Sequence, residues 1–260
     1  MNHQIPAPLV GFDAMRWPFG PNKIELPQNT IHVWAASLRH DPAKIEQLRQ
    51  ILTEDERARA DRFYFEKDRE AYTAARGQLR LLLGRYLQLE PNTIRFTYSS
   101  YGKPSLAEPF AKSGLHFNVT HSHDLAIYGF IWDNELGIDV EYKYRKPTPD
   151  FVGISTHFFA PSEQAVLGRH QGEAALREAF YRCWTRKEAY LKASGEGLSR
   201  ALDSFHVTLT AHEPAKLLYV KNEPQEVERW TMMHINVNKE YTAAMCVEGN
   251  NLSMSCWRLI

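Results

Sequence analysis

The chain has 260 residues, of which 43% are hydrophobic and 24% charged, a composition typical of a soluble globular protein with an ample core. Basic and acidic residues both number 31, so the zero net charge gives no support to nucleic-acid or membrane binding. Three scattered cysteines are too few for a disulfide framework or a zinc ribbon and favour the cytoplasm. We expect neither a signal peptide nor a membrane helix, because no apolar run reaches about 18 residues.

The first part of the chain predicts a lead-in, a strand and two helices. Residues 1–29 are rich in Pro, Gly and Asn and predict an irregular segment. Residues 31–38 (IHVWAASL) predict a strand. Thr53–Glu56 (TEDE) fits a capping box, which opens a helix that continues through RARADRFYF. Leucines at helical spacing predict a second helix over 71–89, and residues 94–98 predict another strand.

Strands and helices alternate less regularly after this point. Residues 117–120 and 125–132 predict strands on either side of a polar turn, and 136–141 (LGIDVE) alternates as a strand does. Residues 161–167 predict a short helix, and 174–193 predict a longer one that is interrupted near 184–185. Later strands are predicted at residues 205–209, 216–220, 230–237 and 241–247. Without a regular βα repeat, the fold class is α+β.

Two carboxylates stand out in the LGIDVE strand. Asp139 and Glu141 are two residues apart, so they lie on one face of the strand, roughly 6.6 Å apart along it. They repel each other unless a cation lies beside them. A solvated strand face is the alternative interpretation of this pair taken alone.

The segment 184–198 (WTRKEAYLKASGEGL) adds a third acid and a lysine. Glu188 and Lys192 lie one turn apart on the predicted helix. Two structural interpretations compete with a functional one: a surface ion pair, and a capping box formed by Thr185 and Glu188. Three acids and a lysine that converge are what a metal-bound pyrophosphate needs.

Further polar groups come from two turns and from arginines along the helices. His121, with Thr120 and Ser122, follows an apolar strand and forms either a small anion pocket or a hydrogen-bonded loop. Lys103 lies in a Gly-Lys-Pro turn and is either a mobile cation held near a rigid backbone, available to a ligand, or a plain surface lysine. One or two of the arginines reach a phosphate in the functional interpretation, and the rest are solvated or pair with acids: Arg57, Arg59, Arg62, Arg76 and Arg80.

Read together, these segments resemble the Sfp-type 4′-phosphopantetheinyl transferases. The matching stretches run from about residue 93 to residue 209, and a looser match, RFYFEKDREAYTAARGQLR, extends towards residue 57. They read TIRFTYSSYGKPSL, LHFNVTHS, LGIDVE, HFFAPSEQAVL and FYRCWTRKEAYLKASGEGLSRALDSFHV. The pairing of GIDVE with WTRKEAYLK is the most specific part. The motifs of P-loop, Rossmann, serine hydrolase and zinc protease sites do not occur.

The resemblance implies an activity and a fold. The enzyme would move the 4′-phosphopantetheine arm of coenzyme A to a serine of an apo carrier protein (acyl or peptidyl), with Mg²⁺, and release adenosine 3′,5′-bisphosphate. Such transfer activates fatty acid, polyketide or nonribosomal peptide synthesis. The implied fold is two pseudo-twofold-related α+β halves, each a small antiparallel sheet packed with a helix. A faint composition break near Asp133 divides them into residues 1–133 and 134–260, and a chain with both halves is expected to be a monomer.

The resemblance also implies roles for the acids and the lysine. Asp139, Glu141 and Glu188 match the family's metal-binding acids, and Lys192 matches the lysine at the pyrophosphate. Glu188, Lys192 and Asp139 are therefore the expected catalytic residues. Glu188 is the preferred general base, and Glu141 is the second choice.

The remaining matched positions concern coenzyme A. Two departures from the family pattern are Thr120, where serine is commoner, and Glu56, where some members have a phosphate-binding lysine. The residues implied to contact coenzyme A are Arg59, Arg76, Tyr101, Gly102, Lys103, Pro104, Thr120, His121 and Lys192. Arg76 is the weakest of these, because its alignment needs a gap.

Two other functions remain open at this point. A metal-dependent pyrophosphohydrolase would use similar carboxylates without a carrier protein, and a non-catalytic module would bind coenzyme A alone. The sequence does not identify the carrier protein, the tolerance for acylated coenzyme A, or the preference between Mg²⁺ and Mn²⁺.

Overall fold

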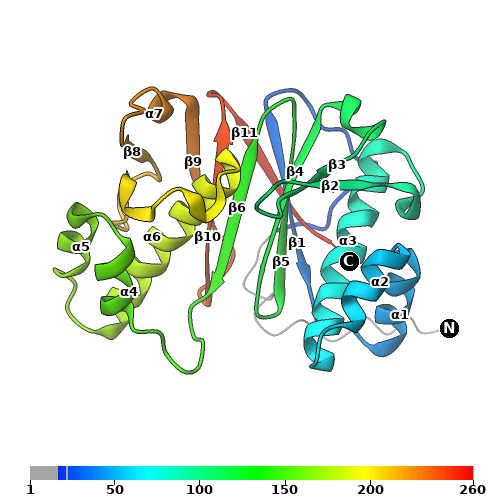
Figure 1. Cartoon of the computed structure of the whole chain (residues 1–260), viewed down its shortest axis with the longest axis horizontal. Coiled ribbons are helices and arrows are strands. Elements are labelled where there is room, and N and C mark those ends of the chain that lie inside the picture. The colour runs from blue at the N-terminus through cyan, green and yellow to red at the C-terminus, as the bar shows by residue number, and fades with distance from the viewer. Residues whose placement is uncertain (1–16, 22, 260) are drawn as a thin grey trace.

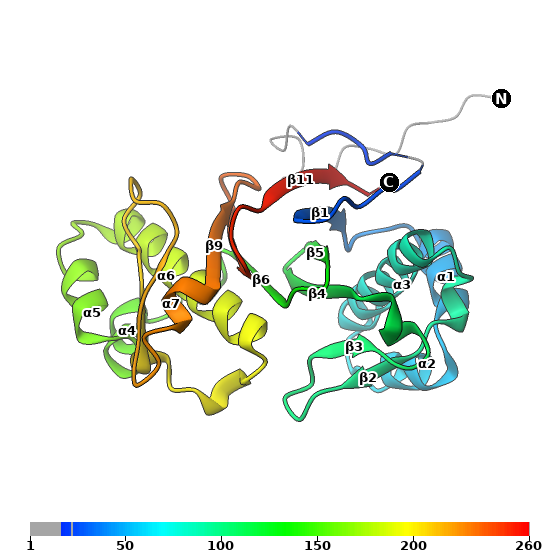
Figure 2. The same ribbon diagram turned by 90° about the horizontal axis from the view of Figure 1, so that it is seen from above.

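The computed structural model describes residues 17–21 and 23–259. The first part of the predicted lead-in, and with it the expectation about a signal peptide, falls on residues 1–16, outside this range. Two sheets lie face to face, and each carries one long helix on its outer side (Figures 1 and 2). In the described part of the chain, no helix is long and apolar enough to cross a membrane.

The first sheet has the strand order β11-β1-β5-β4. Its strands are β1 (Thr30–Ser37), β4 (Leu115–Ser122), β5 (Leu125–Trp132) and β11 (Ser253–Arg258). The pairs β1–β5 and β5–β4 are antiparallel, while β1 and β11 are parallel. Helix α3 (Glu66–Leu87) packs on the outer face through Ala74, Leu79 and Leu82.

The second sheet is smaller and has the order β6-β10-β9. Its antiparallel strands are β6 (Leu136–Tyr142), β9 (Trp230–Ile235) and β10 (Tyr241–Glu248). Helix α6 (Glu173–Ser194) covers its outer face. Each half therefore pairs one sheet with one helix of 22 residues, as the α+β expectation had it.

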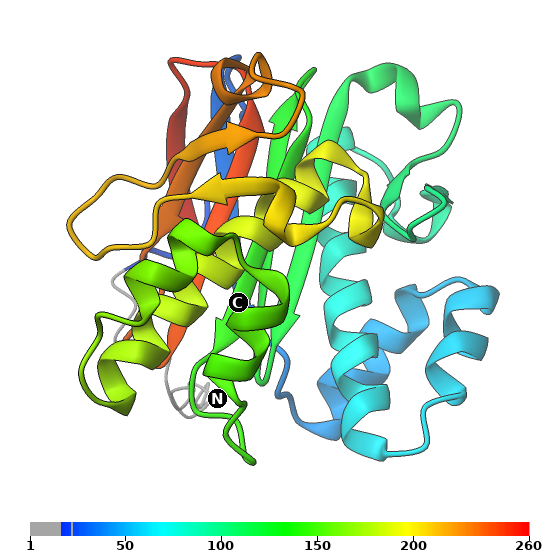
Figure 3. The same cartoon turned by 60° about the vertical axis from the view of Figure 1, so that its left-hand side comes forward.

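Shorter elements surround these layers. Helices α1 and α2 lie beside α3, and Figure 3 shows α4, α5 and the β7–β8 hairpin on the side of the second half. The helices are α1 (Pro42–Ile51), α2 (Glu54–Asp61), α4 (Phe151–Phe158), α5 (Pro161–Leu167) and α7 (Glu226–Arg229); the strands are β2 (Phe96–Tyr98), β3 (Pro104–Leu106), β7 (Phe205–Val207) and β8 (Leu217–Val220); the 3₁₀ turns are Pro91–Thr93, Phe110–Ser113, Gly197–Ser199 and Leu202–Ser204.

Alternation along β5 explains how one strand serves two cores. Ile127 and Ile131 face the second sheet, whereas Tyr128 and Phe130 face α3, and all four are fully buried. Successive side chains of a strand point to opposite faces, so a sheet covered on both sides reads as a continuous apolar run. The LAIYGFIW sequence of β5 has this character.

The two sheets meet along a seam between their edge strands β4 and β6 (Figure 2). Polar side chains of β4 take the place of a backbone ladder. Asn118 Oδ1 accepts from the Ile138 N–H at 3.0 Å, Thr120 Oγ1 from the Val140 N–H at 3.3 Å, and Ser122 Oγ from the Tyr142 N–H at 2.9 Å. The edge of β6 is thereby hydrogen-bonded, although no strand pairs with it there.

Several local predictions were tested by these elements. The N–H of Thr53 donates to Glu56 Oε2 at 3.1 Å, as in a capping box, but the helix ends at Asp61 and does not continue through residue 65. The expected interruption of α6 near 184–185 is wrong, and so is the capping box at Thr185. That hydroxyl donates to the Tyr181 carbonyl at 2.9 Å inside a continuous helix.

The predicted boundary at residue 133 lies in the turn between β5 and β6, which connects the two sheets. Strand β11, which the sequence did not predict, returns from the C-terminal part of the chain to pair with β1. The first sheet therefore takes strands from both ends of the chain. The division into two domains stays a prediction.

Gly137 allows α6 to lie directly on β6. A Cβ atom there would stand 2.2 Å from the Ala189 carbonyl oxygen and 2.2 Å from the Ala193 nitrogen. Both are backbone atoms of a packed helix, so neither can move aside alone. The missing side chain therefore sets the distance between α6 and the acids of β6.

We predict that Gly137→Ala lowers the free energy of unfolding by roughly 1–3 kcal/mol, because it overpacks this contact. Gly168→Ala is the control: its φ is −64°, and its nearest heavy atom would lie at 3.4 Å. Urea denaturation measures both. Equal stability of the two variants would contradict the close-packing argument.

Candidate active site

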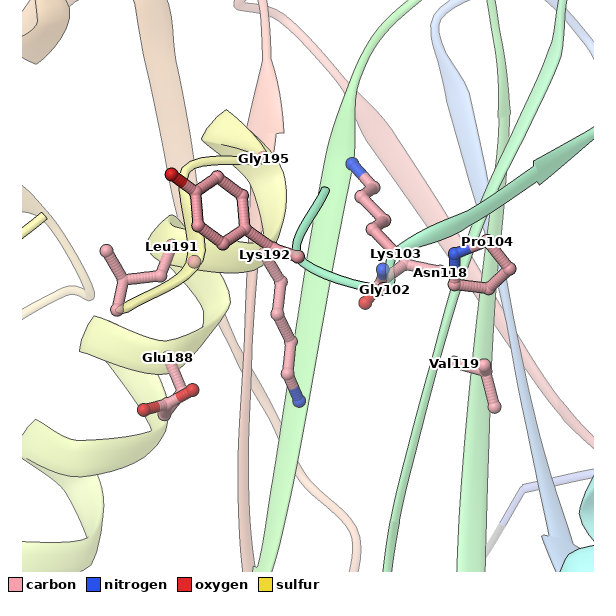
Figure 4. Close-up of a pocket in the computed structure, with 11 residues that line it drawn as sticks. Gly102, Lys103, Pro104, Asn118, Val119, Glu188, Leu191, Lys192 and Gly195 are labelled. Atoms are coloured by element: carbon pink, nitrogen blue, oxygen red, sulfur yellow. The ribbon is translucent and has the colours of Figure 1, made fainter. Parts of the chain in front are cut away.

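The expected metal-binding acids lie where α6 crosses the β4–β6 seam. Asp139 and Glu141 share a face of β6 with Gly137, so they point towards α6, which carries Glu188 and Lys192. Beside them lies a cavity of about 220 Å³ (Figure 4). Its lining comprises Tyr101, Gly102, Lys103, Pro104, Asn118, Val119, Glu188, Leu191, Lys192, Gly195 and Gly197.

Asp139 is 5% exposed, and its two carboxylate oxygens differ. Oδ1 accepts from Lys192 Nζ at 2.6 Å and from the Thr120 hydroxyl at 3.4 Å. Oδ2 is buried and has no hydrogen-bond partner among the residues that the structure describes. Burial raises the pKa of Asp139, and the Lys192 cation opposes that shift.

Glu141 is held by two donors on one oxygen. The Ser122 hydroxyl donates to Oε2 at 3.0 Å, and the Arg145 guanidinium donates to the same atom. Burial raises the pKa of Glu141, and the negative charge of Asp139 raises it further. The two carboxylates are therefore close enough to repel each other.

Glu188 lies one helical turn before Lys192, at the wall of the cavity (Figure 4). Within the described chain its side chain forms no hydrogen bond and no ion pair. Burial raises the pKa of Glu188, and Asp139 and Glu141 add to the shift while Lys192 opposes it. A carboxyl group with a raised pKa and no fixed partner suits a proton acceptor.

Lys192 is anchored at the centre of this group. Its Nζ donates to Asp139 Oδ1, to the Ile138 carbonyl at 3.2 Å and to Thr120 Oγ1 at 3.3 Å. The side chain is still 31% exposed, so its cation also faces solvent. Thr120, from the first half of the chain, thus contacts both Asp139 and Lys192 of the second half.

The carboxylate oxygens of Asp139, Glu141 and Glu188 are suitable ligands for a hard divalent cation. Burial raises the pKa of all three carboxylates, and the charge of Asp139 raises the pKa of Glu141 and Glu188 further. One buried oxygen, Asp139 Oδ2, has no donor among the described residues. Carboxylate oxygens and water are the ligands that Mg²⁺ prefers. Across the described residues, no three acidic, His or Cys side chains are already gathered around one point. Side-chain rearrangement must therefore accompany metal binding.

The Tyr101–Pro104 turn closes the cavity from the first half. Lys103 Nζ pairs with Glu135 Oε2 at 2.7 Å and lies 3.5 Å from the Ala193 carbonyl on α6. The Tyr101 ring lies against Gly197, where a Cβ would be 2.8 Å from it. Hydrogen bonding by His116 first, and then Lys103, lowers the pKa of Glu135 to about 2.

His121, Arg59 and Arg76 lie outside the lining of this cavity, on β4, α2 and α3 respectively. His121 lies on β4, where partial burial of its ring and then the Lys192 cation lower its pKa. Arg59 is exposed and lines a separate surface hollow with Arg62 and Phe63. Neither residue lines the cavity that holds Glu188 and Lys192.

Arg76 is mostly buried, at 9% exposure. It pairs with Glu56 at 3.4 Å and donates to the Tyr98 hydroxyl at 3.0 Å. Glu56 also pairs with Arg80 at 2.6 Å, so it serves the packing of α2 on α3 rather than a ligand. The contacts of Arg59 and Arg76 with coenzyme A stay predictions.

Sequence reasoning missed two residues that shape this site, Asn118 and Arg145, and it named Ser122 only as part of an anion pocket. Asn118 and Ser122 support β6, and the signal was present: Asn118, Thr120 and Ser122 recur at every second position. Arg145 contacts Glu141 from the loop after β6, and no periodicity marks it.

Comparison with known proteins agrees with this geometry. Residues 135–246 match the family model of the 4′-phosphopantetheinyl transferase superfamily, and residues 36–129 match that of the 4′-phosphopantetheinyl transferase N-terminal region. The chain is 37% identical over 241 residues to the 4′-phosphopantetheinyl transferase HetI of Nostoc sp., covering 93% of this chain and 97% of that protein. It is 33% identical over 166 residues to Sfp of Bacillus subtilis, covering 63% and 69%.

A solved structure, the Chronobacterium ammoniagenes ACPS–CoA complex, is 13% identical and covers 45% of this chain and 98% of its own. Its TM-score of 0.32 is too low to support an argument. The sequence matches suffice: the chain belongs to the 4′-phosphopantetheinyl transferase family. The activity inferred from the resemblance, transfer of phosphopantetheine to carrier proteins, is thereby confirmed at the level of the family.

The Lys192–Asp139 pair yields a stability prediction. Because the pKa of Asp139 is raised in the folded state, its burial costs stability as the pH rises above about 4, where the unfolded chain ionises. Lys192→Met removes the opposing cation, so we predict a further loss of roughly 2 kcal/mol at neutral pH.

Urea denaturation at pH 5 and pH 8 tests this prediction, with Asp139→Asn/Lys192→Met as the matched control. The double variant should recover most of the loss, and the recovery should be larger at the higher pH. If the double variant is as unstable as Lys192→Met at both pH values, buried charge is not the cause.

Glu135 yields a prediction of opposite sign. Its folded-state pKa of about 2 lies below the unfolded value of about 4.3, so its stabilising effect is complete above the latter and disappears as the pH falls to the former. Glu135→Gln should therefore be less stable than the wild type at pH 6, and the difference should vanish towards pH 2. Acid unfolding followed by circular dichroism measures this, and a difference that persists unchanged at low pH would refute the assignment.

Proposed function

We propose that the protein transfers the 4′-phosphopantetheine arm from coenzyme A to a serine hydroxyl of an apo carrier protein, with a divalent cation at the β4–β6 seam. The family supports the transfer, and one observation supports the place: three carboxylates with raised pKa values meet the anchored Lys192 there. Asp139, Glu141 and Glu188 would hold the cation, and Mg²⁺ is the expected metal. Bound there, it would neutralise the pyrophosphate oxygens.

In this mechanism the nucleophile belongs to the carrier protein. Its serine oxygen attacks the β-phosphorus of coenzyme A, and adenosine 3′,5′-bisphosphate leaves. Glu188 would accept the serine proton on the carboxylate oxygen that does not hold the cation, because its side chain faces the cavity and has no protein partner among the described residues. Lys192 supplies a positive charge to the oxygens of the leaving phosphate, and the Ile138 carbonyl and Thr120 hold it in position.

The cavity beside Glu188 supports a coenzyme A site. The Tyr101–Pro104 turn and Lys103 form its wall from the first half, and α6 forms the wall from the second half (Figure 4). Lys103 is proposed to contact coenzyme A by leaving Glu135 or by sharing its three donor hydrogens. His121 with Thr120, Arg59 and Arg76 remain proposed contacts of the coenzyme A phosphates.

We also propose that the enzyme is a cytoplasmic monomer. Both walls of the cavity come from one chain, so no second copy is needed to complete it. The three free cysteines agree with a reducing compartment. The carrier protein, and hence the pathway, is the part of the function that still has to be identified by experiment.

Intact mass spectrometry of an apo carrier protein tests the transfer. We expect a gain of one phosphopantetheine arm with enzyme, coenzyme A and Mg²⁺, and no gain with EDTA. Asp139→Asn should abolish the gain while circular dichroism shows an intact fold. Cleavage of coenzyme A without any gain on several carriers would instead favour a pyrophosphohydrolase, and neither reaction would favour a binding module.

The general base predicts a pH dependence. The base must be deprotonated to act, so turnover should rise with pH through the pKa that Glu188 has in the metal-bound enzyme. Glu188→Gln should lower kcat by about 10²–10⁴-fold and remove that rising limb. Lys103→Ala serves as the comparison, because it should raise KM for coenzyme A more than it lowers kcat. An unchanged pH profile in Glu188→Gln would move the role to Glu141.

A further inference from the structure

Three side chains form a closed triangle at Glu141. The Ser122 hydroxyl donates to Glu141 Oε2 at 3.0 Å, and an Arg145 guanidinium nitrogen donates to the same oxygen. That nitrogen also donates to Ser122 Oγ at 2.8 Å. Ser122 in turn accepts from the Tyr142 N–H at 2.9 Å, which fixes its position on the seam. One oxygen of a proposed metal ligand is therefore already taken by a cation of the protein itself.

The two cations at the site are held very differently. Lys192 has three protein acceptors, one of them the Ile138 backbone carbonyl, and its side chain is 31% exposed. Arg145 is 50% exposed, and within the described chain its only hydrogen bonds are to Ser122 and Glu141. Lys192 is part of the framework of the site, whereas Arg145 reaches over it from the surface.

Arg145 can leave Glu141 without a change in any helix or strand. Arg145 lies after the end of β6, in a segment that the structure shows outside any helix or strand. The Arg145 side chain is half exposed, so water can solvate the guanidinium when it leaves, although Glu141 itself is only 16% exposed. Ser122 would keep its hydrogen bond to Glu141 after the arginine leaves, because Ser122 is held independently by Tyr142. The carboxylate would then be free to meet a divalent cation, a stronger partner for hard oxygen.

We propose that Arg145 is a built-in counter-ion, which occupies the Glu141 carboxylate until a divalent cation displaces it. The inference rests on the proposed function, in which Glu141 is a metal ligand. It gives Arg145 a competitive role: the arginine neutralises the acid in the metal-free enzyme and weakens the apparent affinity for metal. Removal of the arginine should therefore strengthen metal binding.

The test is a Mn²⁺ titration of the enzyme without coenzyme A or carrier, with free Mn²⁺ measured by electron paramagnetic resonance. Arg145→Ala should bind Mn²⁺ about two- to fivefold more tightly, the range expected for the loss of an ion pair whose arginine is half exposed. Arg145→Lys, which keeps the charge, should stay near the wild type. Arg229→Ala is the matched control: it removes a 47% exposed arginine that pairs with Glu248 and should leave the affinity unchanged.

A double-mutant cycle separates the proposed metal-ligand role of Glu141 from the proposed counter-ion role of Arg145. Glu141→Gln should weaken Mn²⁺ binding, and Arg145→Ala should then have no further effect in that background. If Glu141→Gln binds Mn²⁺ as the wild type does, the proposed metal ligand is wrong. If Glu141→Gln weakens binding but Arg145→Ala alone does not strengthen it, the metal site stands and the counter-ion role is overturned. Thermal melts of each variant verify the fold.

Discussion

The side-chain hydrogen bonds between β4 and β6 are the constraint on which the rest of the site depends. Two edge strands meet there without a backbone ladder, and Asn118, Thr120 and Ser122 complete the hydrogen bonding of β6. An unpaired edge would leave polar groups unsatisfied or open to other chains. Because side chains and not backbone groups make these hydrogen bonds, β4 and β6 lie farther apart than paired strands do. Polar groups from both halves of the chain therefore meet along the seam.

Two of these side chains, Thr120 and Ser122, also contact the charged groups of the proposed active site. Thr120 accepts from Lys192 and donates to Asp139, while Ser122 donates to Glu141. Gly137 completes the arrangement, because it lets α6 lie against β6 and carry Glu188 and Lys192 to the seam. Burial of several like charges opposes folding, and the raised pKa values of all three acids record that cost. The buried carboxylates therefore lower the stability of the fold, and the same negative charges attract a cation to the site.

Local patterns in the sequence predicted where the acids and Lys192 lie, but they did not predict features that depend on distant parts of the chain. The alternation of LGIDVE placed Asp139 and Glu141 on one face, and helical spacing placed Glu188 and Lys192 together, because both depend on the period of a single element. Strand β11 escaped prediction, since its sequence SMSCWR is short and mixed and its partner β1 is distant in the chain. Thr185 imitated a helix cap but lies within α6, because packing against the sheet overrides the local signal.

The lysines of α6 show the limit most clearly. Lys187 and Lys192 lie five residues apart in one motif, yet Lys187 is fully buried against Glu163 at 2.8 Å and holds the Leu202 and Phe205 carbonyls. Only Lys192 faces the seam. Which lysine packs and which one acts depends on the elements on either side of the helix, and one helix cannot reveal its neighbours. Spacing paired Glu188 with Lys192, and the resemblance to a family gave that lysine its role at the pyrophosphate, but neither indicated what Lys187 packs against.

A crystal structure with coenzyme A and Mn²⁺, solved with anomalous data at the manganese edge, tests the central claim most directly. The account predicts one anomalous peak at the β4–β6 seam, within about 2.2 Å of an oxygen from each of Asp139, Glu141 and Glu188. The pyrophosphate should lie between that peak and Lys192. A peak that contacts none of these carboxylates, or coenzyme A bound away from the cavity of Lys103 and Glu188, would contradict the account.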